Sequence, residues 1–143
     1  MAPDVNAPLY TVEILRLAAS LPDSQRLDRV DGSASSRSHT CGSSVQTDVQ
    51  LTGGRIAALS QTVSACAFGQ ASSALVARHA AGRDKKQVEE ALADLSAWLA
   101  GNRDDPPDWP GYQALAAARG RTGRNGAILL PLQALLAAIE SAS

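Results

Sequence analysis

One stretch of alternating residues does most to restrict what this chain can fold into. From Val45 to Leu51, apolar or β-branched residues alternate with polar ones, a period of two that is typical of a half-buried β-strand. The Thr-Gly-Gly sequence at 52–54 predicts a hairpin turn, and residues 55–63 then return as a second strand. The chain therefore contains an antiparallel hairpin over Ser44 to Val63, and other segments must cover its apolar face.

Several other segments have apolar residues at helical spacing. They are Pro8 to Leu21, Cys66 to Ala81, a segment that starts after Asp84, and Ile128 to Ile139. Asp84 and Gln87 are spaced as a capping box, which marks the start of the third of these helices. The last helix is expected to begin near Pro131, because proline is favoured in a first helical turn.

The region between the last two long helices has a different composition. Residues 102–110 are rich in proline and aspartate, which predicts an exposed and stiff loop with Trp109 as its anchor. A short helix is expected at Tyr112 to Ala118. The next residues, Arg119 to Gly126, form a basic, glycine-rich run that we interpret as a loop.

Together these patterns predict an α+β fold, in which a small antiparallel sheet of about three strands is covered on one face by helices. A two-stranded hairpin is marginal alone, so a third strand is needed, and Leu27 to Ser33 is the best candidate. The overlapping segment Asp31 to Ser38 is small and polar without apolar periodicity, and predicts a loop. We expect a single domain over residues 1–143, with residues 1–8 flexible.

Charge and hydropathy exclude two classes of partner. Thirteen basic and fourteen acidic residues give a net charge of −1, which does not attract a phosphate backbone, so we expect no nucleic-acid partner. No segment approaches the roughly 20 apolar residues that span a bilayer, and the N-terminal sequence lacks the features of a secretory signal. We therefore expect a cytoplasmic protein with no membrane segment, whose two cysteines stay reduced.

The hairpin also predicts that Cys41 and Cys66 lie close together, because they flank its open end. Cys66 precedes a predicted helix, where free N–H groups and the helix dipole favour a thiolate. His39 lies two positions before Cys41, and two thiolates with one imidazole suit zinc or iron, although a complete site usually has four ligands. We predict these three residues as candidate metal ligands. The alternatives are that Cys66 is an inert buried residue and that His39 lies in a surface loop.

The order and spacing of five segments carry a family resemblance. These segments are PLYTVEILRLAASLP, HTCGSSVQTDVQL, GRIAALSQTVSACAFGQASSALV, GRDKKQVEEALADLSAWLAG and NRDDPPDWPGYQALAAARG. From about Leu9 to the last helix, the chain resembles the NifU-like family of iron–sulfur cluster assembly scaffolds, and in particular its SufU-like branch. The resemblance implies a bound iron–sulfur cluster or zinc, a cysteine desulfurase or other protein as partner, and no enzymatic activity. It leaves a homo-oligomer open.

The chain departs from the family at two of four ligand positions. The resemblance implies three cysteines and an aspartate, but Ser43 replaces the aspartate and Ala127 stands where the third cysteine is expected. Two functions remain open. In the first, an iron–sulfur scaffold or accessory protein binds a metal or cluster through Cys41 and Cys66, with help from His39, water, a partner or a second subunit. In the second, the chain is a cluster-free interaction module that docks on a larger complex or on the sulfur-assembly machinery.

Overall fold

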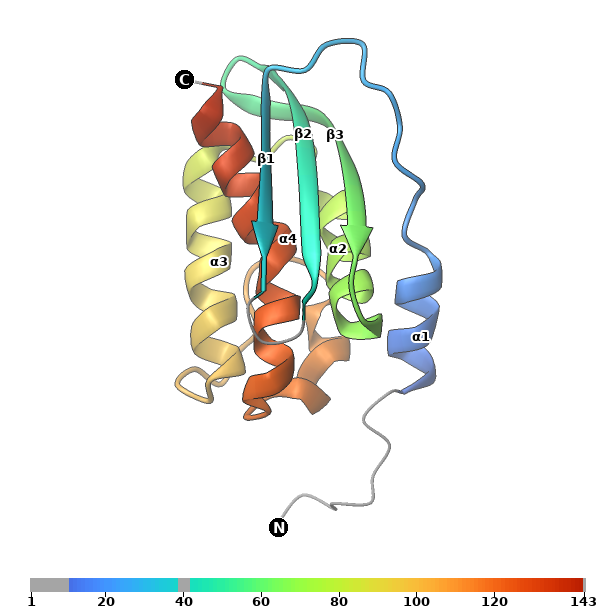
Figure 1. The fold of residues 1–143 in the computed structure, drawn as a ribbon. Coiled ribbons are helices and arrows are strands. Elements are labelled where there is room, and N and C mark those ends of the chain that lie inside the picture. The colour runs from blue at the N-terminus through green and yellow to red at the C-terminus, as the bar shows by residue number, and fades with distance from the viewer. Residues whose placement is uncertain (1–10, 39–41, 143) are drawn as a thin grey trace.

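A three-stranded antiparallel sheet organises the molecule. The computed structural model describes residues 11–38 and 42–142, so the expectation for residues 1–8 lies outside the described residues. The strands are β1 (Gly32–Arg37), β2 (Ser44–Thr52) and β3 (Arg55–Ser64), and they lie in the order β1-β2-β3. Helices cover one face of this sheet (Figure 1). The predicted α+β fold is confirmed.

The predicted hairpin is formed by β2 and β3. Its turn contains Gly53 and Gly54, whose φ angles of 58° and 78° lie in the left-handed region that favours glycine. The strands pair with Ser44 opposite Ser64, and one irregularity interrupts the register between Gln50 and Leu51. At its open end, the hairpin therefore brings the start of β2 beside the chain that leaves β3.

β1 corrects two expectations from the sequence. It pairs with β2 along Gly32–Arg37, so the loop predicted at Asp31–Ser38 is wrong and the strand predicted at Leu27–Ser33 is placed too early. The physical reason is tertiary contact with the last helix of the chain. A Cβ atom on Gly32 would collide with the carbonyl oxygen of Ala138, so a small residue is needed where that helix crosses the strand. Periodicity within the segment itself carries no sign of this packing.

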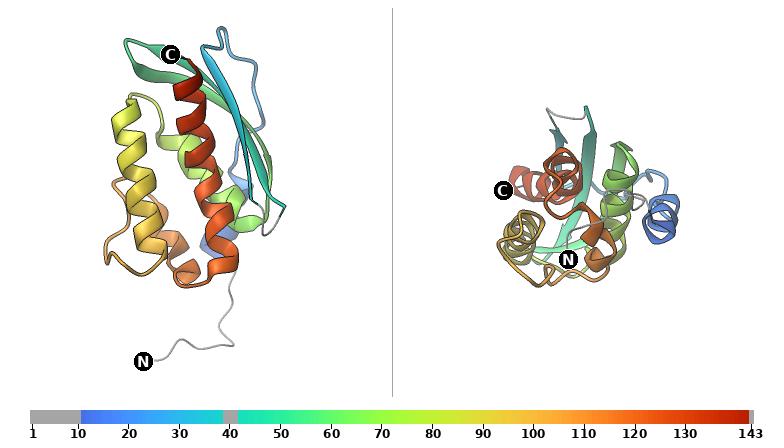
Figure 2. Two further views of the ribbon diagram at one scale, coloured as in Figure 1. Left: turned by 60° about the vertical axis from the view of Figure 1, so that its left-hand side comes forward. Right: turned by 90° about the horizontal axis from the view of Figure 1, so that it is seen from below.

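The helices form a second layer on the sheet. Their bounds are α1 (Val12–Ala19), α2 (Ala67–His79), α3 (Lys85–Leu99), the 3-10 helix η1 (Tyr112–Ala118) and α4 (Thr122–Ser141). α4 packs against β1 and β2, α2 packs against β3, and α3 packs against α4 (Figure 2). α1 lies against α2 at the side of the molecule. Within the described part of the chain, no helix is long and apolar enough to cross a membrane.

The start of α4 differs from the prediction. The helix begins at Thr122 rather than near Pro131, which lies in its interior. Proline has no N–H to donate to the carbonyl group of Ala127 four residues earlier, so its position in the helix carries a local cost. Ala127 and Ile128 are both buried, and α4 packs on α2 and α3. We infer that this burial outweighs the cost and extends the helix into the glycine-rich segment.

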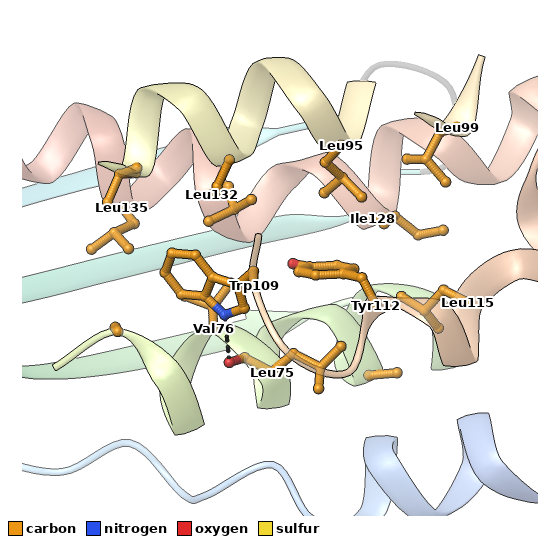
Figure 3. Close-up of a cluster of buried hydrophobic side chains, with 14 of the residues drawn as sticks. Leu75, Val76, Leu95, Leu99, Trp109, Tyr112, Leu115, Ile128, Leu132 and Leu135 are labelled. Atoms are coloured by element: carbon orange, nitrogen blue, oxygen red, sulfur yellow. Dashed lines mark hydrogen bonds between the residues drawn. The ribbon is translucent and has the colours of Figure 1, made fainter. Parts of the chain in front are cut away.

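The loop after α3 is anchored as predicted. Trp109 is buried and donates its indole N–H to the carbonyl oxygen of Leu75 on α2 at 2.9 Å (Figure 3). The guanidinium group of Arg83 lies 4.1 Å from the centroid of the Trp109 ring and also donates to the carbonyl oxygen of Asp108. The capping box of Asp84 and Gln87 is confirmed at the start of α3. These contacts hold the loop against α2 and the beginning of α3.

Three buried polar atoms stand out between the sheet and α2. Thr47 Oγ1, Gln61 Oε1 and Ser73 Oγ have no hydrogen-bond partner among the described residues. Thr47 and Gln61 lie opposite each other in β2 and β3, and Gln61 Nε2 donates to the carbonyl oxygen of Ser73 at 2.9 Å. A buried polar atom without a partner costs about 1–3 kcal/mol. This part of the core is therefore less stable than its burial alone indicates.

Replacing the Thr47 hydroxyl by a methyl group tests this conclusion. We expect Thr47→Val to raise the free energy of unfolding by about 1 kcal/mol, because valine keeps the shape and strand preference while removing the desolvated hydroxyl. The midpoint of thermal unfolding should rise by about 3 °C. Thr62→Val, at an exposed position of β3, is the control and should change stability by less than about 0.5 kcal/mol. A clear loss of stability in Thr47→Val would show that the hydroxyl is engaged.

Candidate functional site

Cys66 lies between the end of β3 and the beginning of α2. It is the N-cap residue of α2, has extended backbone angles (φ −67°, ψ 174°), and its side chain makes no capping hydrogen bond. The thiol is free and the residue is half-buried. Gln70 Nε2 donates to the carbonyl oxygen of Ala65 at 3.0 Å, which fixes the turn that carries Cys66. The Cys66 thiol therefore lies at the N-terminus of α2 and is not used to cap it.

The start of β2 lies at the same end of the sheet. Ser43 directly precedes β2 and is buried, and the pairing of Ser44 with Ser64 places it near the chain that leads into Cys66. The Ser43 carbonyl oxygen accepts a hydrogen bond from the Ser38 N–H at 2.8 Å, which closes the base of the connection between β1 and β2. Residues 39–41 of this connection lie outside the described residues. The predicted roles of His39 and Cys41 therefore remain predictions.

Ala127 packs beside the turn that carries Cys66. It lies in α4 and is 1% exposed. A Cβ atom on Gly69, one turn into α2, would approach the Cβ atom of Ala127 to 3.5 Å and that of Ala65 to 2.6 Å. The contact with Ala127 would be an ordinary van der Waals contact, whereas the contact with Ala65 would be a collision, so the turn before α2 requires glycine at position 69. Three of the four positions implied by the family resemblance, Ser43, Cys66 and Ala127, gather at one end of the fold.

A buried hydrogen-bond network holds this end of α4 in place. Ser72 Oγ on α2 donates to the carbonyl oxygen of Ile128 at 2.6 Å and lies 2.7 Å from the Tyr112 hydroxyl on η1. Tyr112 is fully buried in the core near Ile128 (Figure 3). Burial raises the pKa of Tyr112 well above its usual value, and the hydrogen bond with Ser72 offsets only part of this effect. Sequence reasoning missed this network, because a serine within a helical pattern carries no sign of its partners.

The described residues alone do not form a complete metal site. Among them, no group of three or more His, Cys, Asp or Glu residues is arranged to hold a metal ion. His79 is half-buried at the C-terminal end of α2, at the opposite end of that helix from Cys66. Burial lowers the pKa of His79, and the charges of Arg78 and Arg83 lower it further. Of the predicted ligands, Cys66 is the one that the structure describes.

Comparison with solved structures finds the same fold in two other proteins. The structure is similar to the N-terminal part of a nitrogen-fixing NifU-like protein from Brucella abortus, with a TM-score of 0.84 and 26% identity over 94% of each chain. It is also similar to a protein from Fervidobacterium islandicum described as an iron–sulfur cluster assembly scaffold for the SUF system. That match has a TM-score of 0.78 and 17% identity, and covers 92% of this chain and 96% of the other.

No protein-family model matches the chain, and no curated protein matches its sequence. The two structural comparisons nevertheless agree on fold and coverage, and the first also has 26% sequence identity. They confirm, at the level of the fold, the resemblance to NifU-like and SufU-like proteins that the cysteine segments indicate. Similarity of fold does not establish which residues bind a metal, because at Ser43 and Ala127 this chain differs from the ligands that the resemblance implies.

Removing the Tyr112 hydroxyl tests the network behind the site. At neutral pH, Tyr112→Phe should lower the free energy of unfolding by about 1 kcal/mol, because a buried hydrogen bond is lost. The raised folded-state pKa means that the contribution of Tyr112 is present below pH of about 10, the unfolded pKa, and is lost as the pH rises further. Urea unfolding at pH 7 and pH 11 should therefore show the difference between the two proteins shrinking towards zero. A difference that is constant with pH would contradict this account.

Proposed function

We propose that this protein is a divergent iron–sulfur cluster assembly scaffold or accessory protein, which holds a metal ion or cluster as cargo through Cys66 and Cys41. The observation that carries the proposal is the placement of the Cys66 thiol at the N-terminus of α2, beside Ser43 and Ala127, on a fold shared with scaffold proteins. The pairing of Ser44 with Ser64, which brings the start of β2 beside the chain that leads to Cys66, supports the proposal.

The ligand set makes this cargo weakly held. A methyl group at Ala127 donates nothing to a metal, and the serine hydroxyl at position 43 replaces the harder and charged carboxylate that the resemblance implies. Two thiolates with His39 supply three ligands, and a tetrahedral zinc or iron site needs a fourth. Under this proposal, water, a second copy or a partner protein completes the coordination. A cytoplasmic protein that supplies sulfur, such as a cysteine desulfurase, is the partner that this chemistry requires.

A cluster-free interaction module is the second candidate function. It is supported by the burial of the two substituted positions, because Ala127 is 1% exposed and Ser43 is 3% exposed. Small residues at positions 43 and 127 are buried and contribute to packing, which is compatible with a protein that has lost its cluster and keeps the fold for binding another protein. In this case Cys66 is a half-buried residue with no metal chemistry.

Metal analysis of cysteine variants distinguishes the two candidates. The wild type, Cys66→Ser and Cys41→Ser are purified without oxygen, incubated with ferrous iron and sulfide or with zinc alone, and desalted. We expect the wild type to retain metal below one equivalent, and each variant to lose most of it, because serine is a far weaker soft-metal ligand. Circular dichroism controls for folding. Equal metal content in all three proteins would contradict the scaffold proposal and favour the interaction module.

Restoring the substituted ligands gives a gain-of-function test. If the four positions converge as proposed, Ser43→Asp combined with Ala127→Cys should bind zinc at least about tenfold more tightly than the wild type, because two direct ligands are added. Competition with a chromogenic chelator measures the affinity. Ala134→Cys is the matched control, because it adds a cysteine at another buried position of α4, about two turns further along. No gain over this control would show that the positions do not converge.

A further inference from the structure

α1 is apolar on two of its faces. Ile14 is fully buried, and Leu17 and Ala18 pack against the core next to α2. On the outer side, Val12 is 64% exposed and Leu15 is 50% exposed. Among the described residues, the exposed large hydrophobic side chains are these two and Val30. Two of the three therefore lie on one eight-residue helix, on a face that the described residues do not cover.

A groove runs between this helix and α2. Its volume is about 560 Å³, which falls in the size range of binding sites. Its lining consists of Thr11, Val12, Glu13, Arg16, Leu17, Ser20 and Arg78. Val12 and Leu17 give the groove an apolar surface, while the two arginines add cationic groups to it. Cys66, the candidate ligand that the structure describes, is not part of this lining.

The charges of the groove are unbalanced. Within the described part of the chain, neither Arg16 nor Arg78 takes part in an ion pair, and Glu13 is the one carboxylate in the lining. Arg78 donates to Ser20 Oγ at 3.2 Å, and that hydroxyl donates to the carbonyl oxygen of Leu17 at 2.7 Å. One guanidinium group is thus held in place before any ligand arrives, which lowers the entropy cost of binding.

We propose that this groove is a docking site for an acidic segment of a partner protein, which places an apolar side chain against Val12 and Leu17 and carboxylates against Arg16 and Arg78. Arginine binds carboxylates with two parallel hydrogen bonds, which gives such a contact direction as well as charge. Leu15, exposed on the same helix, extends the apolar area available to the partner.

A second copy of this chain fits the groove less well. Symmetric pairing through α1 would bring two further arginines into a site that already has more cationic than anionic groups. A stable dimer also buries about 800 Å² per partner, which an eight-residue helix with two exposed large apolar side chains does not supply. Charge and area both favour a short, acidic segment of another protein.

Two matched peptides test the proposal directly. The probe is a short fluorescein-labelled amphipathic peptide with leucine on one face and glutamate on the other, and its control carries lysine in place of glutamate. At low ionic strength, we expect fluorescence anisotropy to show binding of the glutamate peptide at least about tenfold tighter than the lysine peptide. Added salt should weaken the binding. In nuclear magnetic resonance spectra, the affected amides should belong to α1 and to the end of α2 around Arg78.

Variants of the groove identify the residues responsible. Arg16→Glu combined with Arg78→Glu should weaken binding of the glutamate peptide at least about tenfold, and Val12→Ser should weaken it several-fold. Arg26→Glu and Val30→Ser are matched controls at exposed positions outside the lining, and should bind as the wild type does. Circular dichroism confirms that each variant is folded.

Three results would overturn the proposal. They are equal binding of both peptides, binding that is unchanged in the arginine variant, and a wild-type dimer in sedimentation that Val12→Ser dissociates. The last result would mean that a second copy occupies the groove. The arginine variant should retain wild-type metal content in the cysteine assay. Failure of the docking proposal is therefore distinguishable from failure of the scaffold proposal.

Discussion

The pairing of β2 with β3 is the constraint on which the site and much of the packing depend. Because Ser44 lies opposite Ser64, the residues just before β2 and just after β3 meet at one end of the sheet. A shift of one residue would turn every side chain of one strand to the other face and would expose Val45 and Val49, which are fully buried. The same register that buries these valines therefore also sets Ser43 near Cys66. One strand pairing thus contributes both to the packing of the core and to the placement of Ser43 near Cys66.

Three features of the fold could be predicted from short stretches of the sequence. The hairpin follows from alternation and a glycine turn, the start of α3 follows from Asp84 and Gln87, and the anchored loop follows from Trp109. Each of these features depends on residues that are close together in sequence or on one large apolar side chain. For the same reason, Cys66 was correctly placed at the beginning of a helix.

The features that sequence reasoning missed depend on contacts between distant segments. β1 is a strand because it pairs with β2 and because Gly32 admits α4, and neither fact is visible in its own small, polar residues. α4 continues through Pro131 because burial on both sides of it outweighs a lost hydrogen bond. The contact of Ser72 with Tyr112 and Ile128 joins three elements that are far apart in the chain. The role of Cys41 and His39 stays a prediction for a different reason, since both lie outside the described residues.

The contact between β1 and α4 has a consequence for how the protein is made. Gly32 lies against the Ala138 carbonyl, and the Ser33 N–H donates to Ser141 Oγ. The start of β1 is therefore packed against the C-terminal end of α4. Ser33 and Ser141 are 108 positions apart, so β1 leaves the ribosome well before the end of α4 does. The hairpin can pair early, but the outer strand gains its final support when translation has passed α4. During that interval the nascent chain exposes an unpaired sheet edge, which can pair with other chains. Aggregation is therefore a greater risk at this stage than after α4 has packed.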